Sequence, residues 1–157
     1  MSKFESFSKE AEQRKTFALQ KDNGMDGNSL IPHDMWRRLI PIAMEYDRGL
    51  GAMATLYTYI LSNVNGQKDN DRYMSAWPSV ERIAKETGIG KNRIAPISDA
   101  LEAVGLLRTS YDYSSNKRDK LYFPQYYSSL SDEEIHANMA EWKRKIGEKN
   151  KHKQTKK

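Results

Sequence analysis

This sequence contains no cysteine among its 157 residues. Disulfide bonds, thiolate zinc sites and cysteine nucleophiles are therefore excluded, and the composition suits a reducing cytoplasm. Long hydrophobic runs are also missing, because no apolar stretch approaches the roughly 20 residues that span a bilayer. The charged N-terminal stretch MSKFESFSKEAEQRK lacks the apolar segment of a secretory signal. We therefore expect a cytoplasmic protein without a membrane segment.

Catalytic and ligand-binding motifs are equally scarce. His33, His136 and His152 are scattered along the chain and do not have the spacing of metal ligands. The glycines at 88–90 join two expected helices and do not form a phosphate-binding loop. We therefore predict a protein that is not an enzyme and that uses no metal, cofactor or small-molecule ligand.

Positive charge is present in moderate excess. The chain has 26 Lys and Arg against 21 Asp and Glu, and its formal net charge is +5. The last eleven residues, GEKNKHKQTKK, hold five lysines and one glutamate. A basic balance makes a polyanionic partner plausible. We expect residues 148–157 to form a disordered lysine-rich tail, which on DNA would add salt-sensitive, sequence-independent affinity.

The first half of the chain predicts a polar arm followed by helices. Residues 1–28 are polar, and Ser8–Lys21 within them has the composition of a helix. A short helix follows Pro32, and Pro41 is expected to end or kink it. Apolar residues recur at helical spacing over Leu50–Val64, which predicts a central core helix.

Two further helices and a hairpin are expected in the middle of the chain. Ser79 is placed to cap a helix that Gly88 ends, and a second helix is predicted over Lys91–Val104. After Gly105 the apolar period changes from helix to strand. Strands are predicted over Leu106–Tyr113 and Lys120–Phe123, joined by a polar, basic turn.

The C-terminal region predicts one amphipathic helix. Ser131 and Glu134 have the spacing of a capping box, and Gly147 is expected to end the helix. Its apolar stripe consists of Ile135, Met139, Trp142 and Ile146. Such a stripe either packs on its own domain or forms a dimer contact. We predict a homodimer, formed either through these residues or through the N-terminal helices.

Residues 78–107 carry a more specific pattern. Ala84, Gly88, Ile94 and Ile97 occupy the fifth, ninth, fifteenth and eighteenth positions of a helix-turn-helix that begins at Val80. Leu101, Gly105, Leu106 and Leu107 follow as L-x-x-x-G-L-L, and LLRTSYDYSSNKRDKLYF has the composition of a wing. Residues 50–123 therefore resemble the winged-helix family of bacterial regulators and replication proteins. Two further segments, LIPHDMW and AMATLYTYIL, loosely resemble the helices that precede the DNA-reading pair in plasmid and phage replication initiators.

The resemblance implies a set of DNA-contacting residues. The helix that starts at Lys91 would enter the major groove by its N-terminal end, and Ser79 would support a phosphate at the preceding helix. Arginine and asparagine side chains can read guanine and adenine there. The residues expected at the DNA are Ser79, Lys91, Asn92 and Arg93, with Asn116, Lys117, Arg118 and Lys120 at the wing.

Pro96 departs from the family pattern, because it lies inside the helix expected to read DNA. An internal proline loses a backbone hydrogen bond and clashes with the preceding turn, at a cost of about 3 kcal/mol. The helix should therefore either begin later, near Arg93, or kink.

The expected fold class is mainly α with a small β-hairpin, a winged helix-turn-helix with accessory N- and C-terminal helices. The expected domains are the arm 1–28, the winged helix-turn-helix 29–128, the C-terminal helix 129–147 and the tail 148–157. The expected function is sequence-specific binding of double-stranded DNA, as a transcriptional regulator or replication-initiation factor of a bacterial mobile element. The alternative is a winged-helix protein-interaction module that does not bind specific DNA.

Overall fold

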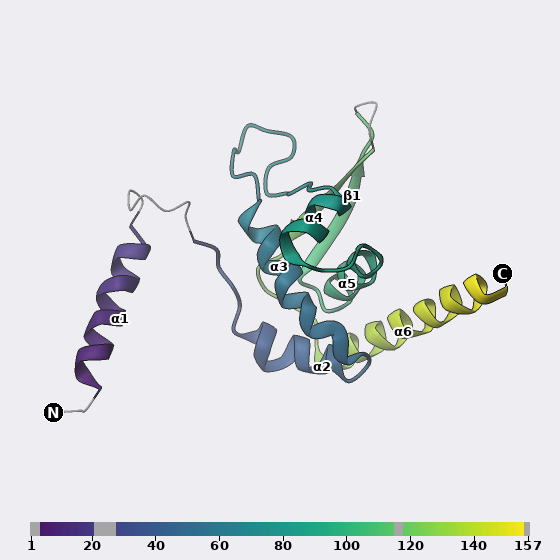
Figure 1. The fold of residues 1–157 in the computed structure, drawn as a ribbon, viewed down its shortest axis with the longest axis horizontal. Helices are drawn as coiled ribbons and strands as arrows, with labels where there is room; N and C mark the ends of the chain where they lie inside the picture. Colours follow the sequence, from purple (N-terminus) through teal and green to yellow (C-terminus); the bar gives the residue numbers. More distant parts are fainter. Residues whose placement is uncertain (1–3, 21–27, 115–117, 156–157) are drawn as a thin grey trace. The chain divides into compact units, whose positions relative to one another are not determined.

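A computed structural model provides the fold of this chain, and it describes residues 4–20, 28–114 and 118–155, with side chains up to residue 152 (Figure 1). The chain divides into two compact units, residues 1–30 and 31–157. The first unit contains helix α1 (Glu5–Ala18), none of whose residues is buried. The predicted helix therefore exists, but it begins at Glu5 and ends at Ala18.

The second unit is mainly helical. In chain order it contains η1 (Met35–Leu39), α2 (Ile40–Met44), η2 (Arg48–Ala52), α3 (Met53–Ser62), α4 (Val80–Thr87), α5 (Lys91–Ala103), β1 (Leu107–Asp112), β2 (Asp119–Pro124) and α6 (Asp132–Thr155). The strands form one two-stranded antiparallel sheet, the only sheet among the described residues. The mainly α fold class with a small hairpin is therefore confirmed. None of the described helices combines the length and apolar composition that crossing a bilayer requires.

Helix α3 occupies the centre of the core, as its apolar pattern predicts. Half of its ten residues are buried, namely Met53, Leu56, Tyr57, Ile60 and Leu61. It contacts α4, α5 and β2 (Figure 1). The expected helix over Leu50–Val64 opens with the 3₁₀ segment η2, and α3 follows it directly.

Pro41 does not end the helical segment in which it lies. It falls in the first turn of α2, where its missing N–H costs least. The preceding segment, η1, has the wide π-type turn. Met35, Leu39 and Ile40 are buried on both sides of the junction, so apolar burial continues through it.

Helices α4 and α5 are joined by the turn that Gly88 makes possible. Gly88 has a φ of +78°, a conformation that is costly for residues with a Cβ. Its N–H donates to Ala84 O at 3.0 Å and ends α4. Ile83, Ile94 and Ile97 are all almost fully buried behind the turn, as the pattern predicts.

Pro96 neither shortens α5 nor delays its start. The helix runs unbroken from Lys91 to Ala103 with the proline inside it. The expectation of a start near Arg93 is therefore wrong. Ile94 and Ile97 flank Pro96 and are each about 1% exposed, and burying such side chains contributes about 1.5–3 kcal/mol apiece. That burial is large enough to offset the lost backbone hydrogen bond.

The exit from α5 into the hairpin is a Schellman motif centred on Gly105. Leu106 N–H donates to Leu101 O and Gly105 N–H to Glu102 O, both at 3.0 Å. Gly105 has a φ of +85°. The strands then pair from Leu107↔Pro124 to Asp112↔Asp119.

A third extended segment lies against the other edge of β2. Ala76 and Tyr122 exchange two backbone hydrogen bonds, of 2.9 and 2.8 Å. This bridge connects the segment before α4 to the hairpin. The hairpin is therefore held to the helical body twice, at β1 by the chain that leaves α5 and at β2 by this bridge.

Helix α6 begins as predicted and ends later. Glu134 N–H donates to Ser131 Oγ at 3.1 Å, and Ser131 N–H donates to Glu134 Oε2 at 3.4 Å, which is the predicted capping box. The helix then continues past Gly147 to Thr155. The expected helix end at Gly147 is therefore wrong, and lysine-rich residues expected to be disordered belong to the helix.

The apolar stripe of α6 packs on its own domain. Ile135 and Met139 have no exposed surface, Trp142 is 7% exposed, and Ile146 is partly buried against the same core. The stripe is therefore not an exposed surface on which a second copy could dock. A homodimer through another surface stays a prediction.

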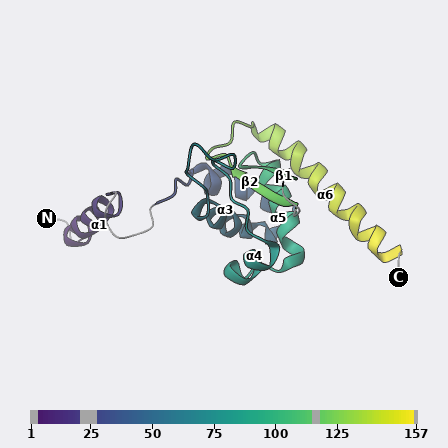
Figure 2. The ribbon, with the colours of Figure 1, turned by 90° about the horizontal axis from the view of Figure 1, so that it is seen from above.

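Polar contacts attach α6 to the body at several points, one of which is the contact of Tyr46 Oη with His136 Nδ1 at 2.8 Å. Arg38 Nη1 lies 2.9 Å from Asp132 Oδ1, Asn138 Nδ2 donates to Ala103 O at 3.0 Å, and Trp142 Nε1 donates to Pro96 O at 2.9 Å. Because residues 138 and 142 meet the end and the middle of α5 in that order, the two helices run in opposite directions (Figure 2).

Candidate nucleic-acid interface

The first turn of α5 presents two unpaired polar side chains. Lys91 and Asn92 are exposed, and neither makes a hydrogen bond or ion pair to another described side chain. Ile94 and Ile97, on the opposite face, are buried in the core. Packing of the inner face therefore fixes the helix while the outer face of its first turn stays open to a ligand.

Arg93 lies beside them but is held by the protein itself. Its Nη1 is 3.5 Å from Asp47 Oδ2, and its side chain is 45% exposed. Asp47 is held in turn by the N–H of Gly49, which donates to Oδ1 at 2.8 Å. A Cβ at Gly49 would lie 2.7 Å from Arg93 Nη2, so the glycine makes room for the guanidinium. Arg93 therefore lies on the exposed surface of α5 and also contacts Asp47 at the start of η2.

The start of α4 is capped by Ser79, as predicted. Ser79 Oγ accepts the N–H of Arg82 at 3.1 Å, and the residue is exposed. Further along α4, Glu86 accepts hydrogen bonds from Tyr59 and Arg82, which lower the pKa of its carboxyl. This neighbouring acid is therefore ionised, and its charge is offset by Arg82.

The hairpin carries cations above aromatic rings. The Arg118 guanidinium lies 4.3 Å from the centre of the Tyr111 ring, and Lys120 Nζ lies 5.2 Å from that of Tyr122. Both distances are within the range of cation–π attraction. Asn116 and Lys117, expected at the same tip, lie outside the described residues. The described part of the hairpin therefore offers two exposed cations, Arg108 on β1 and Arg118 near the tip, and one half-buried cation, Lys120.

Arg72 holds the two strands together at the base of the tip. Its side chain donates to Asp112 Oδ2 and Asp119 Oδ2, each at 3.0 Å. These aspartates face each other in the strand register, where like charges are destabilising. Hydrogen bonds from Ser114, followed by those from Arg72, lower the pKa of Asp112 to about 2. Arg72 therefore neutralises a repulsive pair.

We expect Arg72→Ala to loosen the end of the hairpin selectively. Two ionised carboxylates would then face each other without a counter-charge. Hydrogen–deuterium exchange should show lost protection at the Asp112 end of β1 and β2, with α3 unchanged. Adding Asp112→Asn to the same chain removes the repulsion and should restore much of the protection. Equal loss in α3 and the hairpin would contradict this role.

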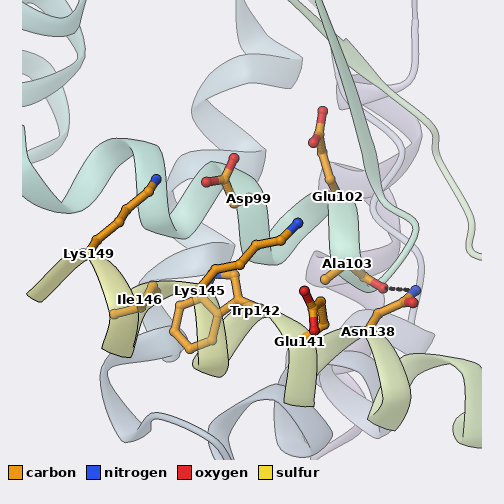
Figure 3. A pocket seen from close by; sticks show the side chains of 9 residues that line it. All are labelled: Asp99, Glu102, Ala103, Asn138, Glu141, Trp142, Lys145, Ile146 and Lys149. Atoms are coloured by element: carbon orange, nitrogen blue, oxygen red, sulfur yellow. Dashed lines mark hydrogen bonds between the residues drawn. The ribbon is translucent and has the colours of Figure 1, made fainter. Parts of the chain in front are cut away.

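A groove of about 490 Å³ lies between α5 and α6 (Figure 3). Asp99 and Glu102 line it from α5, and Trp142, Lys145 and Lys149 line it from α6. Partial burial raises the pKa of Asp99, and the nearby lysines act in the opposite direction. Within the described residues, no group of three or more His, Asp or Glu side chains is placed to hold a metal ion.

No sequence motif predicts the roles of two residues near the candidate interface. Asp47 and Arg72 lie in polar connecting segments, far along the chain from the partners that define their roles. A single sequence shows only that such loops are polar, because the pairing depends on how the helices pack.

No family model, curated protein or solved structure matches this chain. Its function must therefore be inferred from its own residues and geometry.

Proposed function

We propose that this protein binds duplex DNA as a winged helix-turn-helix, with the start of α5 in the major groove. One observation carries the proposal: Lys91 and Asn92 are exposed on the first turn of a helix whose other face is buried, and neither pairs with a side chain that the structure describes. A helix end of this kind fits the major groove, where lysine reads guanine and asparagine reads adenine.

The order of elements supports the same assignment. Two helices meet across the Gly88 turn, and the second passes through Gly105 into a hairpin that carries Arg118 and Lys120. In this proposal the hairpin is the wing and its cations contact flanking phosphates. Ser79 supports a phosphate at the start of α4. Arg93 contributes after it exchanges its contact with Asp47 for one with DNA.

The protein would act by occupying a site, without chemistry of its own. Such occupancy serves a transcriptional regulator or a replication-initiation factor of a bacterial mobile element. Both roles need the same physical property, a site-specific grip on double-stranded DNA.

A second candidate, a protein-interaction module, is favoured by the charge of the body. Residues 143–157 contain eight Lys and Arg and one Glu, which leaves 18 basic and 20 acidic residues in 1–142. Residues 1–142 as a whole therefore lack the net positive charge common in DNA-binding domains. Exposed aromatic side chains, including Trp36, Tyr113 and Tyr127, would serve as contacts in that case.

Selection from a pool of random duplexes distinguishes the two candidates. The full chain should enrich one sequence motif, and Lys91→Ala with Asn92→Ala should weaken binding to it at least tenfold. The magnitude follows because each good base contact contributes about 1–3 kcal/mol of discrimination. Band shifts on the enriched duplex provide the measurement.

The matched control is Gln67→Ala with Lys68→Ala, which removes one amide and one cation from an exposed loop. Its affinity for the enriched duplex should stay within a factor of two or so of the unsubstituted chain, since exposed surface changes have small effects. Failure of the full chain to retard any duplex at low salt would reject DNA binding and favour the interaction module.

A further inference from the structure

The C-terminal half of α6 carries the positive charge of this protein. Residues 1–142 have a slight acidic excess, so the net charge of +5 comes entirely from residues 143–157. Electrostatic attraction to a polyanion scales with such a local field. The attraction must therefore originate mainly at this end of the chain.

This basic segment is helical over most of its length. Because α6 extends to Thr155, residues 143–155 form a rod of roughly 18 Å at 1.5 Å per residue. Duplex DNA carries one phosphate charge per about 1.7 Å of axis, so a duplex along this rod presents roughly ten phosphates. A helix keeps its lysines at fixed spacing, which a disordered tail does not.

The direction of α6 brings this rod to the side on which α5 begins. Asn138 meets Ala103 at the end of α5, and Trp142 meets Pro96 nearer its start. The part of α6 beyond residue 146 therefore extends toward the side on which α5 begins (Figure 2). A duplex that receives the first turn of α5 lies on the same side as the basic rod.

The packing face of α6 loses its apolar residues within the rod, after Ile146. Ile146 is the last apolar residue of the stripe, and Lys149 follows it one turn later in the groove beside α5, with Lys145 (Figure 3). From Gly147 to His152 the helix carries no large apolar side chain. Helices that lie on membranes need an apolar face as well as a basic one, so a bilayer suits this segment less well than DNA does.

We propose that residues 143–155 of α6 form the main electrostatic contact of this protein with duplex DNA, against backbone phosphates beside the groove that α5 enters. The inference rests on the proposed function. It assigns the nonspecific affinity for DNA to α6 and the sequence specificity to α5. The lysines with described side chains are Lys143, Lys145, Lys149 and Lys151. Arg144 contributes less, because Glu141 and Glu148 pair with it.

Asp99 opposes this contact. Its carboxylate shares the groove with Lys145 and Lys149 and offsets part of their charge. Asp99→Asn keeps the size of the side chain and removes that charge. It should therefore tighten DNA binding, which is the opposite of what a loss of structure would produce.

The test uses the full chain, a fluorescein-labelled mixed-sequence duplex and a salt series. The variant is K143Q/K145Q/K149Q/K151Q, since glutamine has nearly the helix propensity of lysine. The plot of log K against log salt has a negative slope, and each lost phosphate contact makes that slope less steep by about 0.9. We expect the slope to become less steep by up to about 3.6 and the Kd at low salt to rise at least tenfold.

The control variant, K9Q/K15Q/K68Q/K85Q, removes the same charge elsewhere and should leave the slope nearly unchanged. Circular dichroism checks that the helix content of both variants is preserved. An unchanged slope in the α6 variant overturns this inference, provided the unsubstituted chain binds the duplex. If the unsubstituted chain binds no duplex, the proposed function itself fails. Loss of binding to phosphatidylserine vesicles with full retention of duplex binding would reassign the segment to a membrane and overturn the inference.

Discussion

Replacing Trp142 by alanine should lower the free energy of unfolding by about 3–5 kcal/mol, the usual cost of removing a buried tryptophan. The ring is 7% exposed and packs α6 on the core, and its Nε1 donates to Pro96 O at 2.9 Å. For a chain of this size, each kcal/mol changes the melting temperature by about 2–4 °C. Thermal unfolding followed by circular dichroism should therefore show a decrease of roughly 6–20 °C.

Trp142→Phe provides the matched comparison. It keeps an aromatic ring against α5 and removes the indole N–H, so only the hydrogen bond and a little packing are lost. We expect a cost of about 1–2 kcal/mol, typical for one hydrogen bond to a buried carbonyl. If the alanine and phenylalanine variants melt at the same temperature, the ring does not hold α6 on the core.

Among the glycines that the structure describes in the second unit, Gly105 should be the one whose replacement by alanine lowers the free energy of unfolding most. The residue has a φ of +85°, which is unfavourable for alanine by roughly 1–2 kcal/mol. Its new Cβ would also lie 2.6 Å from Ser128 Oγ and 3.1 Å from Leu130 Cδ1. Overpacking of this kind costs about 1–3 kcal/mol more. Urea unfolding should therefore give a total loss of about 2–5 kcal/mol.

Gly88→Ala separates the two contributions. Gly88 has nearly the same backbone conformation, with a φ of +78°, but nothing lies within 4 Å of a Cβ built there. Only the backbone cost of about 1–2 kcal/mol applies. A loss at Gly88 as large as that at Gly105 would show that crowding by Ser128 and Leu130 contributes nothing.

These predictions concern the two junctions that position the proposed DNA surface. Gly105 sets the direction in which the chain leaves α5 for the hairpin, and Trp142 fixes α6 against α5. Since Trp142 directly precedes the basic rod, its loss should also uncouple that rod from the start of α5. The stability of the fold and the geometry of the proposed DNA contact therefore depend on the same contacts.

Local sequence patterns determined the elements of this protein. Helical spacing of apolar residues predicted α3 and α6, the change to a period of two predicted the hairpin, and Gly88 and Gly105 marked the turns. Such features depend on the neighbours of each residue along the chain, and a single sequence contains that information. The capping box of α6 was predictable for the same reason.

The tertiary structure decided the rest, because the outcome depended on contacts between distant segments. Pro96 stays inside α5 since core packing outweighs its local cost, and α6 continues past Gly147 although glycine often ends a helix. The stripe of α6 was amphipathic in sequence, but only packing showed that α5 and the core cover it. Arg93 likewise pairs with Asp47, and Arg72 pairs with Asp112 and Asp119. These partners lie far apart along the chain, and local sequence patterns do not predict such pairs.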